Sequence, residues 1–318
     1  MTEIKPKEMR VILVSGFLGA GKTTFIRNMI ARTGKTFCVI ENEYAGSDVD
    51  KSMIEGDNDE IKVWEMTEGC ICCTMKNSLP NKIMNILSLY GPDYLIIEAT
   101  GIGYLSRIIE NVRTVEHSRV RLMRTITIVS ADSVETMRYQ DDALYKDQIQ
   151  NGQMIVLSKC ESWGTEERRQ AEQYIRSLNP NAKIVTTPYA NAKKEWWDAL
   201  LAKYFDGGII TTEEEEIWDR LTLCDVRLSG LGDIFRLMED IVNGRLGQIA
   251  RVKGFVKAGE QWVQCDISGE RYAVAGISAQ QRSNMVFIGK SLNKAGIQER
   301  FLREKPVRIR YSSKKIAG

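Results

Sequence analysis

The chain lacks the features that would place it in a membrane, on a secretory route or on nucleic acid. It has no apolar run of about 18 residues, so we expect no transmembrane helix. Residues 1–7 have no apolar core of the kind that a signal peptide needs. Because such a core is absent, we expect a cytoplasmic protein. The 44 Lys and Arg exceed the 42 Asp and Glu by only two. Without a strong field of one sign, we expect partners that are neither nucleic acid nor membrane.

The sequence does contain enough material for two domains and an ordinary core. It has 318 residues, of which 43% are hydrophobic, and both values are usual for globular proteins of two domains. Seven cysteines are present. In the cytoplasm these thiols are expected to be reduced, so a cluster of them indicates metal or redox chemistry rather than a disulfide framework.

The order of the predicted elements indicates an α/β domain over residues 1–208. Strand-like and helix-like segments alternate there, and strands that are apolar on both faces imply a mostly parallel sheet covered by helices. The predicted strands are residues 11–14, 36–40, 61–64, 94–97, 125–129, 154–157 and 184–187, and the predicted helices run to about residue 32, from 77 to 89 and from 165 to 178. Residues 195–200, with Trp196 and Trp197, are expected to form a helix anchored to the core.

The composition then changes. Residues 209–219 hold four consecutive glutamates, which repel one another, so we expect an acidic surface linker; an acidic interaction patch is the alternative. Residues 220–318 are predicted to form a smaller α+β domain with a helix-backed sheet. Its predicted strands are 224–228, 249–257, 261–267, 271–275, 284–288 and 306–311, with one helix whose apolar face is Leu231, Ile234, Phe235, Met238, Ile241 and Val242 and another over 291–302 capped by Ser291.

A phosphate-binding loop is predicted at Gly16–Thr23, which matches the pattern G-x-x-x-x-G-K-[ST] in full. A β-branched run precedes it and a helix-like segment follows it, as the mechanism requires. The glycines let backbone N–H groups approach a phosphate, and the helix N-terminus adds partial positive charge. Lys22 would reach the β- and γ-phosphates, and Thr23 would offer its hydroxyl to Mg²⁺. The predicted nucleotide contacts here are Gly16, Gly19, Ala20, Gly21, Lys22, Thr23 and Thr24.

Two further segments are predicted to complete the phosphate site. Glu98 ends a buried strand, where a carboxylate can hold Mg²⁺ directly or through water, and Gly101 offers a backbone N–H to a γ-phosphate. The segment 41–50 combines carboxylates with a glycine, as a mobile switch loop does. Three carboxylates of this segment, those of Glu43, Asp48 and Asp50, could approach Mg²⁺ or the attacking water.

Three cysteines within four positions, Cys70, Cys72 and Cys73, are improbable as core filler. Thiolates so close together can share one soft or borderline metal ion, and three ligands leave a fourth place for water, a side chain or a partner. Buried free thiols and a redox pair are the alternatives. A metal site between the two phosphate-binding segments would be remade when a loop moves.

Recognition of the base is assigned to Ser158-Lys159-Cys160-Glu161, which follows a predicted strand. GTP-binding domains typically have Asn-Lys-x-Asp at this place, where the carboxylate accepts from guanine and the lysine stem covers the ring. In this sequence Lys159 matches the lysine of that motif and Glu161 stands at the aspartate position. Ser158 stands at the asparagine position and has no side-chain amide. Guanine is favoured because a carboxylate pairs poorly with the acceptor N1 of adenine; the longer Glu161 arm leaves ATP open.

With these elements in order, the sequence resembles the CobW family of P-loop GTPases over nearly its whole length. The matching segments are 16–24, 41–44 with Asp50, 69–73, 98–101, 158–161, 252–256 and 286–289. The resemblance implies slow GTP hydrolysis with Mg²⁺, in which Lys22, Glu98 and Glu43 take part. It also implies a transition metal, Zn²⁺ or Co²⁺, on Cys70, Cys72 and Cys73, and a chaperone role towards a metalloenzyme or corrinoid-protein client. A nucleotide-dependent homodimer is compatible with it.

Two alternatives stay open. A P-loop small-molecule kinase with structural cysteines would need an arginine lid, for which Arg119, Arg121 and Arg124 are candidates. A nucleotide-gated binding module of a corrinoid or methyl-transfer system would bind without turnover. His117 is the single histidine, and we expect it to be solvated rather than a ligand. The absence of His-rich segments argues against metal storage.

Overall fold

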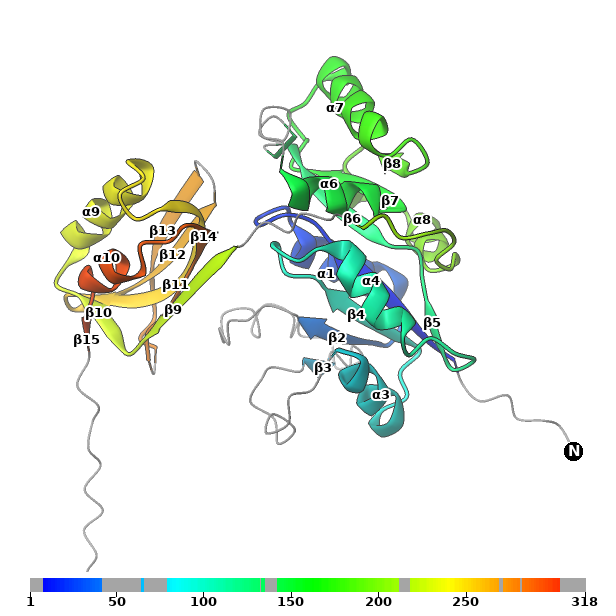
Figure 1. The fold of residues 1–318 in the computed structure, drawn as a ribbon, viewed down its shortest axis with the longest axis horizontal. Coiled ribbons are helices and arrows are strands. Elements are labelled where there is room, and N and C mark those ends of the chain that lie inside the picture. Colours follow the sequence, from blue (N-terminus) through cyan, green and yellow to red (C-terminus); the bar gives the residue numbers. More distant parts are fainter. Residues whose placement is uncertain are drawn as a thin grey trace, which may run out of the picture. The chain divides into compact units, whose positions relative to one another are not determined.

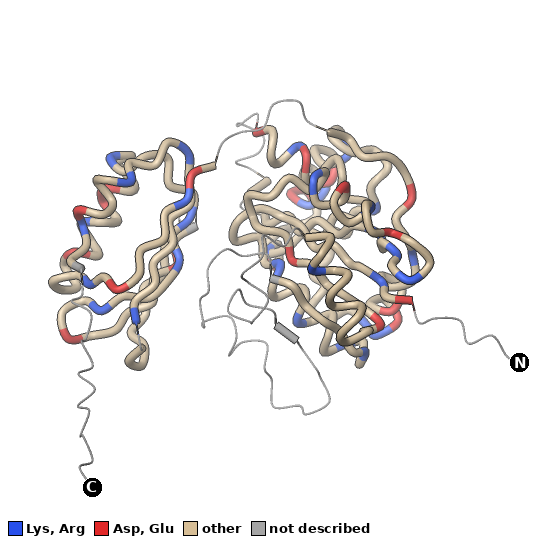
Figure 2. The backbone as a smooth tube through the Cα atoms, turned by 60° about the horizontal axis from the view of Figure 1, so that its bottom comes forward, with Lys and Arg blue, Asp and Glu red and all other residues tan. Residues whose placement is uncertain are grey.

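The computed structural model divides the chain into two compact units, Met1–Glu216 and Ile217–Gly318 (Figure 1). It describes residues 8–41, 64–65, 79–131, 133–134, 142–211, 218–268, 271–280 and 282–303. Within these residues no helix has the length and apolar character needed to cross a membrane. Figure 2 shows Lys and Arg interspersed with Asp and Glu along the backbone of both units.

A parallel sheet forms the centre of the first unit. Its strands follow the order β3-β2-β4-β1-β6-β7-β8, β5 also pairs with β1, and all these pairings are parallel. The strands are β1 (Met9–Ser15), β2 (Phe37–Glu41), β3 (Trp64–Glu65), β4 (Tyr94–Glu98), β5 (Val120–Leu122), β6 (Ile126–Ser130), β7 (Met154–Ser158) and β8 (Lys183–Val185). Because the strands run in one direction, the loops that follow β1, β4 and β7 leave the same edge of the sheet.

Helices cover both faces of this sheet. They are α1 (Lys22–Thr33), α3 (Leu79–Leu89), α4 (Leu105–Arg113), α6 (Ala143–Gln150), α7 (Thr165–Leu178) and α8 (Lys194–Leu200), with a 3₁₀ turn, η1, at Tyr189–Asn191. Alternate residues of β1 point to opposite faces. Ile12 and Val14 pack in one cluster with α1 and α8, whereas Val11 and Leu13 pack in another with α3 and α4. The predicted α/β fold is confirmed.

Three elements of this unit, α4, α6 and β5, were not predicted from the sequence. Each is short, and the periodicity of α4 and α6 spans only two or three turns. A capping signal does mark α6, because Asp142 Oδ1 accepts from the N–H of Leu144 at 2.9 Å and of Tyr145 at 3.2 Å. These elements matter for function, since α6 lies against the phosphate-binding loop.

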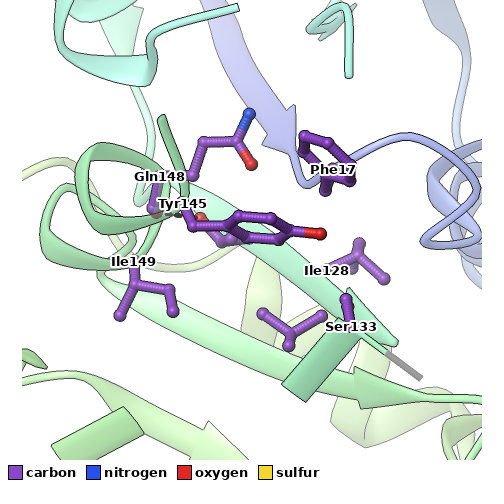
Figure 3. Close-up of a pocket in the computed structure, with 8 residues that line it drawn as sticks. Phe17, Ile128, Ser133, Tyr145, Gln148 and Ile149 are labelled. Carbon is purple, nitrogen blue, oxygen red and sulfur yellow. Dashed lines mark hydrogen bonds between the residues drawn. The ribbon is translucent and has the colours of Figure 1, made fainter. Parts of the chain in front are cut away.

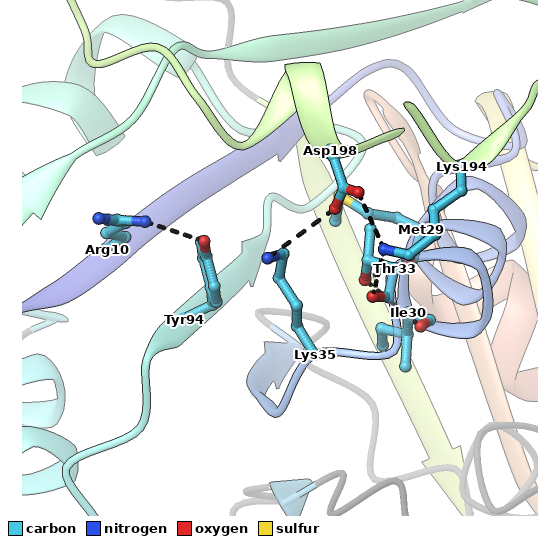
Figure 4. Close-up of polar contacts among 8 residues, drawn as sticks. All are labelled: Arg10, Met29, Ile30, Thr33, Lys35, Tyr94, Lys194 and Asp198. Atoms are coloured by element: carbon cyan, nitrogen blue, oxygen red, sulfur yellow. Dashed lines mark hydrogen bonds and ion pairs between the residues drawn. The ribbon is translucent and has the colours of Figure 1, made fainter. Parts of the chain in front are cut away.

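The end of α1 is fastened to α8 (Figure 4). Lys194 Nζ donates to the carbonyl of Thr33 at 3.1 Å and pairs with Asp198 at 2.9 Å. Trp197 is fully buried, and its ring lies 5.2 Å from that of Phe25 on α1. The helix that carries the phosphate-binding loop at its start is therefore fixed at both ends, and the expected anchoring of 195–200 is confirmed.

The second unit holds a mainly antiparallel sheet. Its order is β13-β12-β11-β10-β15, with β14 between β11 and β9. The strands are β9 (Asp219–Cys224), β10 (Val226–Leu228), β11 (Gln248–Ala258), β12 (Gln261–Ser268), β13 (Arg271–Ile277), β14 (Asn284–Lys290) and β15 (Leu302–Arg303), and the helices are α9 (Leu231–Val242) and α10 (Lys294–Glu299). The predicted smaller α+β domain is confirmed; the strand predicted at 306–311 lies outside the described residues.

Three predictions about this unit were wrong in detail. The strand predicted over 224–228 is interrupted at Asp225, whose φ of 55° separates β9 from β10. Ser291 has a φ of 52° and does not cap a helix; α10 begins at Lys294, and Asn293 caps it by accepting from Gly296 N at 2.9 Å. The predicted apolar face of α9 is split, because Phe235 is 72% exposed while Ile234 is buried.

Candidate nucleotide site

The loop between β1 and α1 lies directly on the neighbouring strand β6. Gly16 has a φ of 140°, and a Cβ at this position would overlap the carbonyl oxygen of Ile128. No residue with a side chain fits there without moving the strand or the loop. The backbone is thus held close to the sheet at the start of α1, and a helix N-terminus of this kind is suited to bind an anion.

Lys22, the first residue of α1, is buried inside this loop. Its exposed fraction is 6%, and Nζ donates to the carbonyl oxygens of Gly16 at 2.9 Å and Phe17 at 3.2 Å. A buried ammonium group needs such partners. They hold one positive charge within the loop, where the partial charge of the helix N-terminus adds to it.

Thr23 and Glu98 bring two oxygen ligands together. Thr23 Oγ1 donates to Glu98 Oε1 at 2.9 Å, and Glu98 lies at the end of β4, in register with Val14 of β1. The carboxylate is 7% exposed. A hydroxyl and a carboxylate side by side at the mouth of an anion-binding loop form the hard oxygen donor set that Mg²⁺ prefers, so these residues fit the ion that the motif implies.

The turn after β4 touches the phosphate-binding loop. A Cβ on Gly101 would lie 2.7 Å from the backbone nitrogen of Leu18 and 2.8 Å from its Cα, so only glycine allows this approach. Gln148 on α6 holds the same turn, because its Nε2 donates to the carbonyls of Gly103 at 3.1 Å and Gly101 at 3.4 Å. The glycine predicted to face a γ-phosphate is thus positioned from two sides.

A narrow crevice between β6 and α6 runs behind the loop (Figure 3). The rings of Phe17 and Tyr145 stack at its mouth, with centroids 4.2 Å apart and planes inclined by 28°. Burial raises the pKa of Tyr145 well above its ordinary value. Through this stack and through Gln148, α6 contacts both the phosphate-binding loop and the turn after β4. Sequence reasoning missed Tyr145 and Gln148, since no motif marks them.

The loop predicted to read the base is tied to the phosphate-binding loop. Ser158 Oγ donates to the carbonyl of Ala20 at 2.5 Å. The next residue, Lys159, has a φ of 55° and is exposed, as is Glu161. Ser158 therefore fastens one loop to the other, while the two charged side chains that follow remain open to solvent and to a ligand.

Arg168 on α7 fastens the base loop from its other side. Its guanidinium donates to three carbonyls, those of Trp163 at 3.0 Å, Thr186 at 3.1 Å and Cys160 at 2.9 Å. The loop after β7 and the loop after β8 are thereby joined. Burial raises the pKa of the Cys160 thiol, and burial, with Glu161 adding to it, raises the pKa of nearby Tyr189 to about 12. Both groups are neutral near pH 7.

Family models match both units. Residues 10–186 match the nucleotide-binding domain of CobW/HypB/UreG, which covers more than half of the chain. The chain belongs to the CobW/HypB/UreG family. Residues 231–304 also match the C-terminal domain of the cobalamin synthesis protein cobW. The resemblance inferred from the motifs is confirmed, and the first unit is a nucleotide-binding domain.

Individual relatives of this CobW-family chain are distant. It is 28% identical over 187 residues to zinc-regulated GTPase metalloprotein activator 1 of Schizosaccharomyces pombe, covering 56% of this chain and 46% of that protein. It is 29% identical over 188 residues to the zinc chaperone YjiA of Escherichia coli, covering 57% and 58%. The chain thus spans about half the length of the curated relatives that it matches. The structure of Zn(II)-bound YjiA from E. coli aligns with a TM-score of 0.45 at 21% identity, over 92% of this chain and 98% of that one.

Not every predicted site residue can be placed. Glu43, Asp50 and the cysteines Cys70, Cys72 and Cys73 lie outside the described residues. Among the residues that the structure describes, no group of three His, Cys, Asp or Glu side chains is arranged to hold a metal ion. His117 Nδ1 accepts from the N–H of Arg119 at 3.0 Å in an exposed turn.

Proposed function

We propose that this CobW-family chain binds GTP with Mg²⁺, hydrolyses it slowly, and uses the nucleotide state to control a transition metal that it delivers in the cytoplasm. The pairing of Thr23 with Glu98 beside the buried Lys22 is the observation that carries this proposal. Lys22 would neutralise phosphate charge, and Thr23 with Glu98 would hold Mg²⁺, which would add further positive charge at the phosphates when bound. Gly101 offers a backbone N–H from a turn that lies so close to Leu18 that no Cβ fits between them.

The proposed base is guanine. Lys159 covers the ring with its stem, and the Glu161 carboxylate accepts from the N1–H and N2–H groups. Ser158 stands where an asparagine is usual, and its proposed role is structural, because its hydroxyl holds the base loop on the phosphate loop. A carboxylate at this position discriminates against adenine, whose N1 accepts.

The proposed cargo is Zn²⁺, with Co²⁺ as the second candidate, held by Cys70, Cys72 and Cys73. Three closely spaced thiolates suit either ion. The names of the relatives support zinc, since two of them are a zinc-regulated activator and a zinc chaperone. The client is then a metalloenzyme or a corrinoid protein, and GTP binding drives the protomers into a homodimer.

The kinase alternative is weakened by the positions of two of its three candidate lid arginines. Arg121 pairs in register with Arg10 on β1, and Arg119 precedes it at the same end of the strand. This is the amino end of β1, whereas the phosphate-binding loop follows the carboxyl end. Arg121 also lies 3.5 Å from Glu116 and over the ring of Tyr204. Arg119 and Arg121 are therefore not placed to close over a phosphate, which leaves Arg124 as the remaining candidate of the three.

The test is an anaerobic titration of the purified chain with Zn²⁺ and with Co²⁺, each with and without a non-hydrolysable GTP analogue. We expect metal affinity to change by tenfold or more, about 1.4 kcal/mol, when the analogue is bound. The combined variant Cys70→Ser, Cys72→Ser, Cys73→Ser should lose the metal and keep the nucleotide, and Lys22→Ala should do the reverse. Unchanged metal affinity in the triple variant would sink the chaperone role, and preference for ATP would sink the base assignment.

A further inference from the structure

Strand β13 is a sheet edge with few of the features that usually prevent an edge from pairing with another chain. Among the described strands it pairs only with β12, so within the described residues no strand pairs with the other side of its seven-residue backbone. From Tyr272 to Gln280 the sequence has no charged residue and no proline. Charges, proline or a very short strand are the usual protections of an edge against pairing with another chain.

The other edges of the two sheets have these protections. Strands β3 and β15 are two residues long and β8 is three, with Lys183 at its start. Strand β9 begins with Asp219 and Arg220, and Asp219 forms an ion pair with Lys294 at 2.7 Å. Strand β13 carries a charge only at its first residue, Arg271, and its other six residues are uncharged. Among the described edges it therefore has the longest stretch without charge, which makes it a template for a further strand.

The face that β13 presents is a continuation of the core. In register, Tyr272 lies beside Ile267 and Val274 beside Cys265, and residues side by side on paired strands share a face of the sheet. Ile267 and Cys265 are buried, whereas Tyr272 is 67% exposed and Val274 is 40% exposed. The apolar face of the sheet thus extends beyond the buried core to β13, and an added strand would bury the side chains of Tyr272 and Val274.

We propose that β13 pairs antiparallel with β13 of a second copy of this chain, about a two-fold axis at Val274. An interface with two-fold symmetry must be complementary to itself. Pairing about Val274 sets Val274 opposite its own copy and Tyr272 opposite Gly276. The large ring of each copy then covers a glycine of the other, a combination that stabilises strand pairs.

The absence of charge is what makes the partner a second copy. In the antiparallel register Arg271 lies opposite Ile277, and no charged residue follows from Tyr272 to Gln280, so two identical edges meet without like-charge repulsion. Two seven-residue strands bury less area than the roughly 1,200 Å² of a stable interface, so we expect a dimer that forms with rising protein concentration. No residue of the proposed nucleotide or metal site lies in β13. The inference therefore goes beyond the proposed function and predicts pairing without nucleotide.

Cysteine cross-linking tests the register. In the full-length chain, Val274→Cys places two thiols directly opposite, with Cβ atoms about 5 Å apart, close to disulfide geometry. The matched control is Tyr272→Cys, whose two copies stand four residues apart, about 13 Å. Under mild oxidation without nucleotide, we expect the Val274→Cys dimer at least tenfold faster than the Tyr272→Cys dimer, with the 274–274 link identified by mass spectrometry. Equal rates in the two variants would overturn the register.

Sedimentation velocity tests the edge itself. The unmodified chain should show a concentration-dependent dimer without nucleotide, and Val274→Lys should remain a monomer, because two ammonium groups would then face each other. Lys22→Ala, which removes nucleotide binding only, should dimerise normally. Circular dichroism checks that each variant is folded. A monomer at every concentration, a dimer that survives Val274→Lys, or a dimer that needs the GTP analogue would each refute the proposal, the last in favour of the nucleotide-dependent dimer alone.

Discussion

The two sheets differ in where they leave their backbone open. The parallel sheet of the first unit ends in strands of two and three residues, β3 and β8, and its chemistry lies in loops after β1, β4 and β7. The mainly antiparallel sheet of the second unit has no such cluster of loops in its described residues, and there it leaves the long edge of β13 without a strand partner. In a parallel sheet the loops after the carboxyl ends of the strands can share one ligand. In an antiparallel sheet an exposed edge strand can pair with a strand of another chain. We infer that the first unit is built for a small ligand and the second for a protein.

The largest expected effects come from two glycines, one in each unit. Gly16 and Gly254 have φ values of 140° and 150°, and a Cβ would overlap the carbonyl oxygen of Ile128 in the first case and of Asn284 in the second. Gly16→Ala and Gly254→Ala should each destabilise its own unit by about 3 kcal/mol or more. Hydrogen exchange measured by mass spectrometry should show lost protection in that unit alone.

Gly34→Ala is the matched control, because Gly34 also has a positive φ, 63°, but a Cβ there meets nothing within 4 Å. It should cost about 1–2 kcal/mol from backbone strain alone. Loss of protection in both units with either of the first two variants would break the comparison, since the units would then unfold as one.

The sequence predicted the phosphate-binding segments of the first unit best, because phosphate binding constrains them locally. Gly16, Lys22 and Thr23 follow one another along the chain, so their spacing alone predicts the loop. Glu98 is the last residue of strand β4, which is buried throughout, and Gly101 follows this strand. In contrast, the pairing of β13 depends on which strands lie beside it, and sequence periodicity does not specify neighbours.

The contacts that support the site were not predictable. Ser158 was read as a departure from a base-recognition motif, and only the fold shows that its hydroxyl reaches Ala20, 138 residues away. Arg168 looks like one of several arginines on an exposed helix. Gln148 and Tyr145 lie on a helix for which only the Asp142 cap gave a signal. Side chains that bind distant backbone carbonyls leave no periodic trace in a sequence.

A moderate effect is expected from Arg168, which joins the loops after β7 and β8. Arg168→Ala removes three hydrogen bonds to carbonyls of Trp163, Thr186 and Cys160. The base loop should lose its fixed position, and GTP affinity should fall by roughly five- to tenfold, about 1 kcal/mol. Isothermal titration with GTP and with ATP measures this change and the selectivity between the bases.

The matched control for Arg168 is one residue further along the same helix. Arg169 pairs with Glu166 at 2.6 Å on the surface, and an exposed pair of this kind contributes little to stability. Arg169→Ala should leave GTP affinity unchanged. Equal losses in the two variants would mean that α7 acts through its overall charge, and the assignment of Arg168 as a positioning residue would be withdrawn.

The smallest effect compares one buried thiol from each sheet. Burial raises the pKa of Cys38 on β2 and of Cys265 on β12 to about 11, so at pH 8 about one molecule in a thousand carries the reactive thiolate. Both should react slowly with iodoacetamide while exposed Cys224 reacts at once. Both buried thiols lie one strand in from a sheet edge, Cys265 beside Val274 of β13 and Cys38 beside Trp64 of β3. We therefore expect similar slow rates at low protein concentration, and only the rate of Cys265 should fall as the concentration rises and β13 becomes paired.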